Sequence, residues 1–277
     1  IFGFCPYFFI RSWQHLGETY LWSLPMVLLS LFLLKQNDSL RVKFFCILSL
    51  VLTVINFNAV NYIIVIMIFF LIYHFIHYSI MRKKIDDISA KRINVYFKSI
   101  FIVSLLSLCI VTPQFYIIVK NVIAARNSMP SAFNLYHRPF QDLFEQSARP
   151  LSYFLPAAVH PVFGKFTEQF IGSSLYGMSF TEHTLYLGWI PLILAFLAFK
   201  GWRRNRKTRT TNHELRITDK EDFYIGFFVF LAIVAWLFSQ PPWWNIFGFK
   251  LYMPSFFMYK ILPMFRAYCR FGIVLML

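Results

Sequence analysis

The chain has 277 residues, of which 58% are hydrophobic and 14% charged, and its formal net charge is +15. Ordinary soluble domains contain about 45–50% apolar and about 25% charged residues. This composition excludes a typical soluble domain and predicts an all-α, polytopic transmembrane protein. The positive charge does not predict a nucleic-acid partner, because it is concentrated in short blocks between long apolar segments. The lipid bilayer is therefore the first expected partner.

Six apolar segments are expected to cross the membrane as helices. We place them at residues 20–34, 44–57, 62–80, 99–119, 184–199 and 223–238. The sequence starts at Ile1 rather than at Met, and both ends lie in apolar runs, so we interpret the chain as a fragment with a partial span at each end. Residues 120–183 are amphipathic and rich in proline, which predicts a large loop with short interfacial helices.

The distribution of basic residues predicts the orientation of these spans. The loops at 35–43, 82–98 and 200–220 contain 17 of the 27 Lys and Arg residues. Because cytoplasmic loops carry an excess of Lys and Arg, these three loops are expected inside the cell and residues 1–18, 120–183 and 239–270 outside. The predicted location is the cell membrane, with multiple passes. His74 and His77 lie near the expected cytoplasmic surface, where an interfacial role is favoured over metal or proton chemistry.

Candidate site residues lie in the expected outer segments. Arg11, His15 and Glu18 have helical i, i+4, i+7 spacing, which places them on one face as a candidate ligand-binding stripe or as a polar collar at the membrane interface. Arg266 and Arg270 are spaced i, i+4. Two guanidinium groups on one helix face fit a phosphate or pyrophosphate, and also fit anionic lipid headgroups.

The long loop supplies weaker candidates, all of which are charged. Spacings of four, three and four residues along YHRPFQDLFEQSARP predict a short amphipathic helix that pairs its own charges. Outward carboxylates would suit proton abstraction or metal binding, although exposed carboxylates are usually only solvated. The weaker candidates are Arg138, Asp142, Glu145, Glu168 and Glu182, and Arg149 ends the predicted stripe. The patterns GxGxxG, GxxxxGK[ST], HExxH and CxxC are absent, so no Rossmann or P-loop nucleotide site and no metal motif is identified.

Four segments resemble a known family. They are CPYFFIRSWQHLGETYLWSLP, PLSYFLPAAVHPVFG, TEHTLYLGWIPLILA and LPMFRAYCRFG. In their order they resemble bacterial multi-pass glycosyltransferase-like proteins of the GT-C type, with YfhO-like membrane proteins as near relatives. The resemblance covers about a third of the chain.

The resemblance implies an enzyme that transfers a sugar from a polyprenyl-phosphate carrier to a cell-envelope acceptor at the outer face of the membrane. It also implies an acidic catalytic base or metal ligand in a first outer loop, which would precede Ile1, so a divalent metal is possible and the catalytic residue is unassigned. By matching segments, Arg11, His15, Arg266 and Arg270 are candidates for lining the donor or acceptor site.

Two other functions remain open. The same arginines would serve a non-enzymatic transporter or flippase of lipid-linked or anionic solutes. A catalytically inactive homologue that acts as an assembly partner is the third alternative.

Overall fold

The computed structural model describes residues 23–36, 39–54, 60–81, 87–128, 139–177, 183–209, 218–261 and 267–276. By their internal contacts, these residues form two compact units. We call residues 23–128 the helical unit and residues 139–276 the mixed unit, and describe each by itself.

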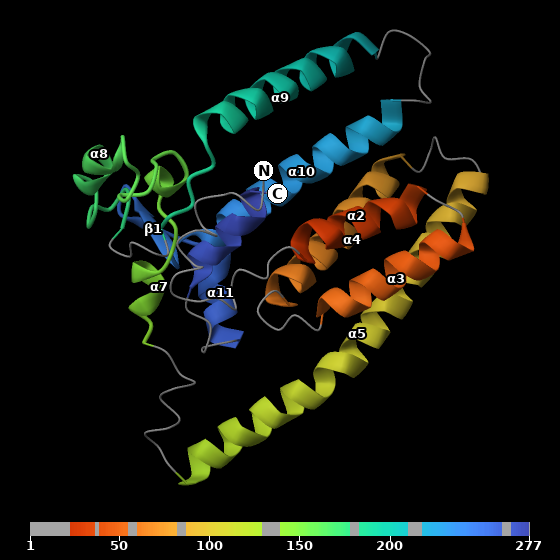
Figure 1. Cartoon of the computed structure of the whole chain (residues 1–277), viewed down its shortest axis with the longest axis horizontal. Coiled ribbons are helices and arrows are strands. Elements are labelled where there is room, and N and C mark those ends of the chain that lie inside the picture. The colour runs from red at the N-terminus through yellow and green to blue at the C-terminus, as the bar shows by residue number, and fades with distance from the viewer. Residues whose placement is uncertain are drawn as a thin grey trace. The chain divides into compact units, whose positions relative to one another are not determined.

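The helical unit contains four described helices: α2 (Ser23–Gln36), α3 (Leu40–Val54), α4 (Val60–Met81) and α5 (Asp87–Ser128) (Figure 1). Helix α3 packs against α2 and α5, and α4 also contacts α2 and α3. Leu24, Val27 and Leu31 of α2 are fully buried. Their spacing of three and four residues places them on one side of the helix, so a single apolar stripe forms the α2 contribution to the core.

The mixed unit begins with short helices and ends with the segment that completes its core. Helix α10 packs along η5, where Phe238 and Phe271 meet with ring centroids 5.6 Å apart, and α10 also contacts α11. Phe223 and Phe227 of α10 are buried one turn apart. The described elements are α7 (Asp142–Glu145), η4 (Pro150–Tyr153), α8 (Gly164–Glu168), α9 (Trp189–Arg209), α10 (Thr218–Ser239), β1 (Trp243–Ile246), β2 (Phe249–Tyr252), α11 (Pro254–Ile261) and η5 (Tyr268–Met276).

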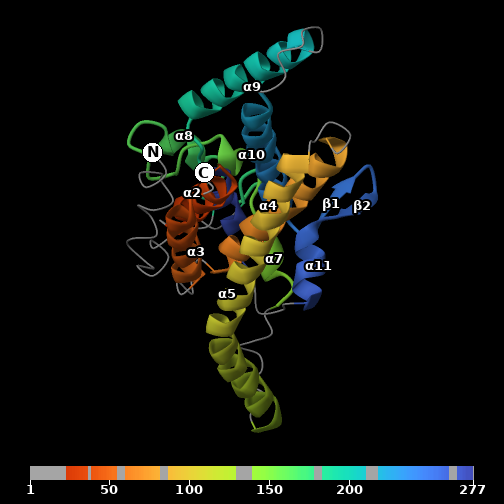
Figure 2. The same ribbon diagram turned by 90° about the vertical axis from the view of Figure 1, so that its right-hand side faces the viewer.

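Strands β1 and β2 form an antiparallel hairpin, which Figure 2 shows beside α11. Trp243 pairs with Tyr252 and Ile246 pairs with Phe249. The two residues of the turn, Phe247 and Gly248, have φ values of 50° and 86°. Positive φ at both central residues is the type I′ pattern that matches the twist of a tight hairpin. The all-α prediction omitted this hairpin.

The predicted polytopic transmembrane architecture is wrong. The chain is mostly helical. However, among the described residues the structure has no helix that combines the length and the apolar character needed to cross a bilayer. With 14 and 15 residues, α2 and α3 reach only ~21–23 Å at ~1.5 Å per residue, against a hydrocarbon core of ~30 Å. The predicted multi-pass location in the cell membrane is wrong for the same reason.

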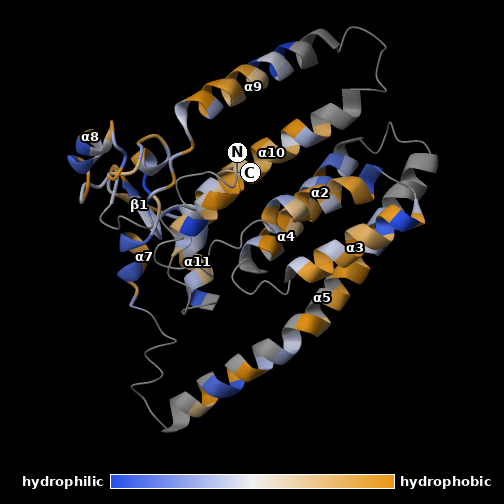
Figure 3. Cartoon of the chain, viewed as in Figure 1, coloured by the Kyte–Doolittle hydropathy of each residue, from blue (hydrophilic) through white to orange (hydrophobic). Residues whose placement is uncertain are grey.

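Several segments that were predicted as loops are helical in the structure. Helix α5 begins at Asp87, inside the expected basic loop 82–98, and continues to Ser128, well into the expected outer loop. Helix α9 continues to Arg209 through much of the expected loop 200–220. Figure 3 shows hydrophobic colours in the first part of α9 and hydrophilic colours near its end. The change from apolar to basic sequence therefore falls within a helix and does not mark its end.

Candidate functional site

A buried group of polar side chains in the mixed unit joins four segments that are distant in sequence. The amide of Cys269 donates to the carbonyl oxygen of Gln146 at 3.1 Å, and that of Ala148 donates to the carbonyl oxygen of Ser239 at 2.8 Å. A third backbone bond links the amide of Leu187 to the carbonyl oxygen of Tyr153 at 3.1 Å. We call this group the polar junction; its members are Gln146, Ser147, Arg149, Ser152, Tyr153, His183, Ser239 and Gln240.

His183 is the fully buried imidazole of the polar junction. Its Nε2 atom lies 2.7 Å from the carbonyl oxygen of Ser147. Because a carbonyl can only accept, Nε2 carries the proton in this bond. The ring lies against Gly177, where a Cβ atom would come within 2.5 Å of the His183 Cε1 atom. The backbone therefore fixes both the position and the protonated nitrogen of this side chain.

Tyr153 and Ser239 form a second part of the junction. The Ser239 hydroxyl donates to the carbonyl oxygen of Trp236 at 2.6 Å, so the Tyr153 hydroxyl is the donor in its 2.5 Å bond to Ser239 Oγ. The Gln240 side-chain amide donates to the same Oγ at 3.2 Å and to the Trp236 carbonyl at 3.0 Å. Burial raises the pKa of the Tyr153 hydroxyl well above its ordinary value, so this phenol stays a neutral donor.

Arg149 is a partly buried cation at the edge of the same group. Its Nη2 atom donates to the carbonyl oxygen of Phe144 at 2.8 Å, and burial lowers the pKa of the guanidinium from its ordinary value. Ser152 Oγ accepts the Arg149 amide at 3.3 Å and donates to the Tyr176 carbonyl at 3.3 Å. These bonds hold the start of η4 against the segment that carries Tyr176.

Some buried polar atoms of the junction have no hydrogen-bond partner within the described part of the chain. Among them are Nε of Arg149, Oε1 of Gln146 and Oε1 of Gln240. A buried polar atom without a partner is unusual in folded proteins and costs about 1–3 kcal/mol. A guanidinium N–H of this kind can donate to an anionic group, and an amide oxygen can accept from a hydroxyl group.

Among the predicted site residues, Arg270 is linked to the junction through its neighbour in the chain. It is half-buried in η5 and directly follows Cys269, whose amide is bonded to Gln146. Asp142 and Glu145 belong to α7, just before the junction, while Glu168 is exposed on α8. The remaining candidates, which lie outside the described residues, are Arg11, His15, Glu18, Arg138, Glu182 and Arg266.

The predicted charged stripe through residues 138–149 is not one helix. Helix α7 contains only Asp142–Glu145, and Arg149 has extended backbone angles of −117° and 158°. Pro150 explains this conformation, because the residue before a proline is pushed out of the helical region. Arg149 therefore turns back toward Phe144 and does not extend a row of charges.

The sequence-based ranking missed His183, Tyr153, Ser239 and Gln240. That ranking favoured charged residues in expected loops. These four side chains lie at the ends of apolar segments, and each of them can be uncharged. Polar side chains next to Pro150 and immediately before Pro241 were a usable signal, because proline often marks the end of an element.

The helical unit encloses a second buried histidine. His74, which was expected at an interface, is only 3% exposed. Its ring centroid lies 5.0 Å from that of Tyr96 and 5.2 Å from that of Phe97. Burial, and then the positive charge of Lys35, lowers the pKa of His74 to about 4. Burial also lowers the pKa of Lys35 to about 7. The His74 ring is part of a packed helical core.

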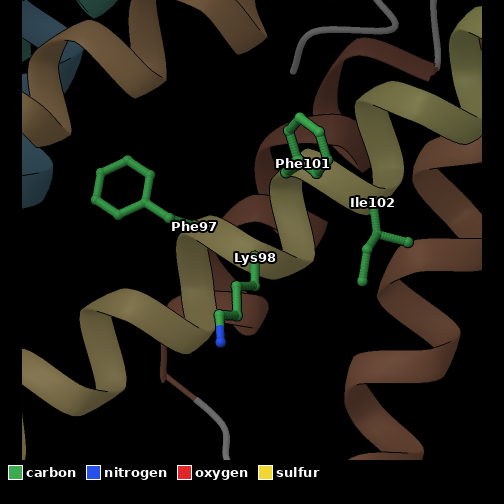
Figure 4. Close-up of a pocket in the computed structure, with 4 residues that line it drawn as sticks. All are labelled: Phe97, Lys98, Phe101 and Ile102. Atoms are coloured by element: carbon green, nitrogen blue, oxygen red, sulfur yellow. The ribbon is translucent and has the colours of Figure 1, made fainter.

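No metal centre provides a competing site in the described residues. Among them, no group of three or more His, Cys, Asp or Glu side chains could hold a metal ion, so we derive no step through the divalent metal that the family resemblance made possible. A shallow hollow on α5 is lined by Phe97, Lys98, Phe101 and Ile102. Figure 4 shows these side chains projecting in different directions from the helix, without converging on a common point.

Comparisons with known proteins identify no relative: no family model, curated protein or solved structure matches the chain.

Proposed function

We propose that this chain binds a polyprenyl-phosphate-linked sugar at the polar junction and takes part in transferring that sugar to an acceptor hydroxyl. The proposal concerns only the donor and the reaction and does not include the transmembrane architecture that was predicted from the sequence. It combines the family resemblance of the sequence with the chemistry of the buried groups.

One observation carries the proposal: three of the four segments that resemble glycosyltransferase-like proteins meet at the junction. Leu187 of TEHTLYLGWIPLILA is bonded to Tyr153 of PLSYFLPAAVHPVFG. Gly272 of LPMFRAYCRFG lies close to both of these segments. A Cβ atom at Gly272 would be 2.8 Å from a Leu185 methyl group and 3.1 Å from the Tyr153 ring. Segments that are far apart in the sequence thus share one packed centre.

The chemistry of the junction supports a sugar phosphate as the ligand. Arg149 and Arg270 lie on the two segments that the Cys269–Gln146 bond joins, and guanidinium groups bind phosphate through charge-assisted hydrogen bonds. The free acceptor atoms of Gln146 and Gln240 can accept hydrogen bonds from sugar hydroxyls. We assign donor binding to these groups and assign proton transfer to no described residue.

Titration with a short-chain polyprenyl-phosphate sugar tests the proposal. Arg270→Gln should weaken binding by about 10- to 100-fold, since a hydrogen bond to a charged group contributes about 1.5–3 kcal/mol. Arg203→Gln is the matched control, because Arg203 is an exposed arginine of α9 in the same unit. Binding that is equal in Arg270→Gln and the unmodified chain would contradict the proposed site.

Transfer is tested separately from binding. The chain is incubated with the radiolabelled donor and a membrane-free extract of envelope polysaccharide, and labelled product is counted. We expect product with the unmodified chain and Arg203→Gln, and at least about a tenfold loss with Arg270→Gln. Tight donor binding without product would restrict the function to binding and refute the transfer step.

A further inference from the structure

The β1–β2 hairpin presents an apolar face and tip to solvent. Phe247 is 99% exposed and Phe249 is 80% exposed, and Leu251 is 52% exposed. Strand alternation places Ile246, Phe249 and Leu251 on one face, since Ile246 pairs with Phe249. We call Ile246, Phe247, Phe249 and Leu251 the hairpin tip. Contiguous exposed apolar residues of this kind mark interaction surfaces.

Folding alone does not explain why a phenylalanine, Phe247, occupies the turn at the hairpin tip. Phe247 has a φ of 50°, a conformation that is unfavourable for a residue with a Cβ atom. Type I′ turns usually use Asn, Asp or Gly at this position. The exposed ring of Phe247 is therefore available for a contact outside this unit.

The opposite face of the hairpin is firmly held. Trp243 stacks on Phe140 with centroids 5.4 Å apart and meets Phe144 edge-on at 4.8 Å. On the partner strand, Tyr252 lies 4.7 Å from Phe256 of α11. The aromatic base thus fixes the hairpin while its tip remains exposed.

Lys250, which is next to Phe249 in β2, and Lys260, which is in α11, place positive charge on the hairpin and on the helix that holds it, and this indicates an anionic partner. Lys250 Nζ lies 5.0 Å from the Trp243 ring centroid and Lys260 Nζ lies 4.6 Å from that of Phe256, and both lysines are exposed. The sequence contains no Asp or Glu after Asp222. A second copy of the chain would bring these lysines close to one another, whereas an anionic surface would attract them.

We propose that the hairpin tip docks on an anionic phospholipid surface. Phe247 and Phe249 enter the interfacial layer, where aromatic residues are favoured, and Lys250 and Lys260 interact with lipid phosphates. Peripheral attachment of this kind needs buried apolar area together with electrostatic attraction. The proposal is independent of the donor-binding function, because it uses other residues and another ligand.

Vesicle co-sedimentation of the full chain tests this surface. The chain should bind phosphatidylcholine vesicles that contain phosphatidylglycerol, and bind vesicles of phosphatidylcholine alone much more weakly. Phe247→Asn should reduce binding about tenfold or more. Asn suits the turn, so lost binding with an unchanged or raised unfolding midpoint separates docking from misfolding. Phe166→Asn, at a 51% exposed position on α8, is the matched control and should bind normally.

Two outcomes would overturn the proposal. The first is equal vesicle binding by Phe247→Asn and the unmodified chain, or binding that does not depend on phosphatidylglycerol. The second is the absence of vesicle binding together with a dimer in analytical ultracentrifugation that Phe247→Asn disrupts, since this would identify a second copy as the occupant. Donor titration without vesicles remains unaffected in either case.

Discussion

Replacing Gly177 by alanine gives a direct test of the packing around His183. Gly177 has a φ of +87°, and a Cβ atom would lie 2.5 Å from Cε1 and 2.7 Å from Nε2 of the buried imidazole. Approach to within 3 Å cannot be accommodated by ordinary van der Waals contact, and the ring is held by its 2.7 Å bond to the Ser147 carbonyl. The ring must therefore move, and this bond must lengthen or break.

Two unfavourable contributions to the free energy of folding add in Gly177→Ala. A non-glycine residue in the left-handed region costs about 1–2 kcal/mol, and overpacking a core typically costs about 1–3 kcal/mol. Gly172→Ala is the matched control, because Gly172 has a φ of +83° and no atom within 4 Å of the added Cβ. Gly172→Ala should therefore show only the backbone cost.

Urea unfolding of the two variants and the unmodified chain measures this difference. We expect Gly177→Ala to lower the free energy of unfolding by about 1–3 kcal/mol more than Gly172→Ala does. Adding His183→Ala to each glycine variant completes a double-mutant cycle, and it should remove most of the extra cost. Equal destabilisation by the two glycine variants would refute the close approach of Gly177 to His183.

The remaining predictions concern the Tyr153–Ser239 pair and the pH dependence of the helical unit. Tyr153→Phe should lower the free energy of unfolding by about 1 kcal/mol, whereas Ser239→Ala should cost about 1–3 kcal/mol because it leaves the buried Tyr153 hydroxyl without its acceptor; urea unfolding that gives the reverse order would contradict the assigned direction of the bond. Burial lowers the pKa of Lys35 from 10.5 to about 7, so between these values the unfolded chain binds more protons and stability should fall as the pH falls from 10.5 to 7. Lys35→Met should abolish this slope, and an unchanged slope in urea unfolding would argue against burial of the ammonium group. The pKa of His74 is lowered from 6.5 to about 4, so stability should fall again as the pH falls from 6.5 towards 4, and His74→Phe should flatten that decline when unfolding is followed by circular dichroism.

The positions of the helices could be predicted in part from the sequence. Each of the six predicted apolar segments contains or overlaps a helix of the structure, as α4 (Val60–Met81) does for residues 62–80. Long apolar runs favour helix, and Pro25 and Pro191 lie in the first turns of α2 and α9, where proline is tolerated. Helix ends were poorly predicted, because the basic sequences after Met81 and Phe199 were interpreted as loops. Basic residues are good helix formers, so a change in charge need not end a helix.

The candidate site was also only partly predictable from the sequence. Arg270, Asp142 and Glu145 were identified from charge and spacing, and all three lie in or next to segments that the backbone bond between Cys269 and Gln146 joins. His183 and Ser239 could not be ranked, because an uncharged or weakly basic side chain in an apolar sequence becomes informative only once its burial and partners are known.

The amino-acid sequence by itself determined the helical character of this protein and its basic balance. Composition carries this information because apolar content and helix propensity are properties of short stretches of chain. Tertiary structure alone decided that the described helices do not span a bilayer, that Tyr153, His183 and Ser239 share one buried junction, and that Phe247 projects from a hairpin. Such facts depend on contacts between segments far apart in the chain, which local patterns do not specify.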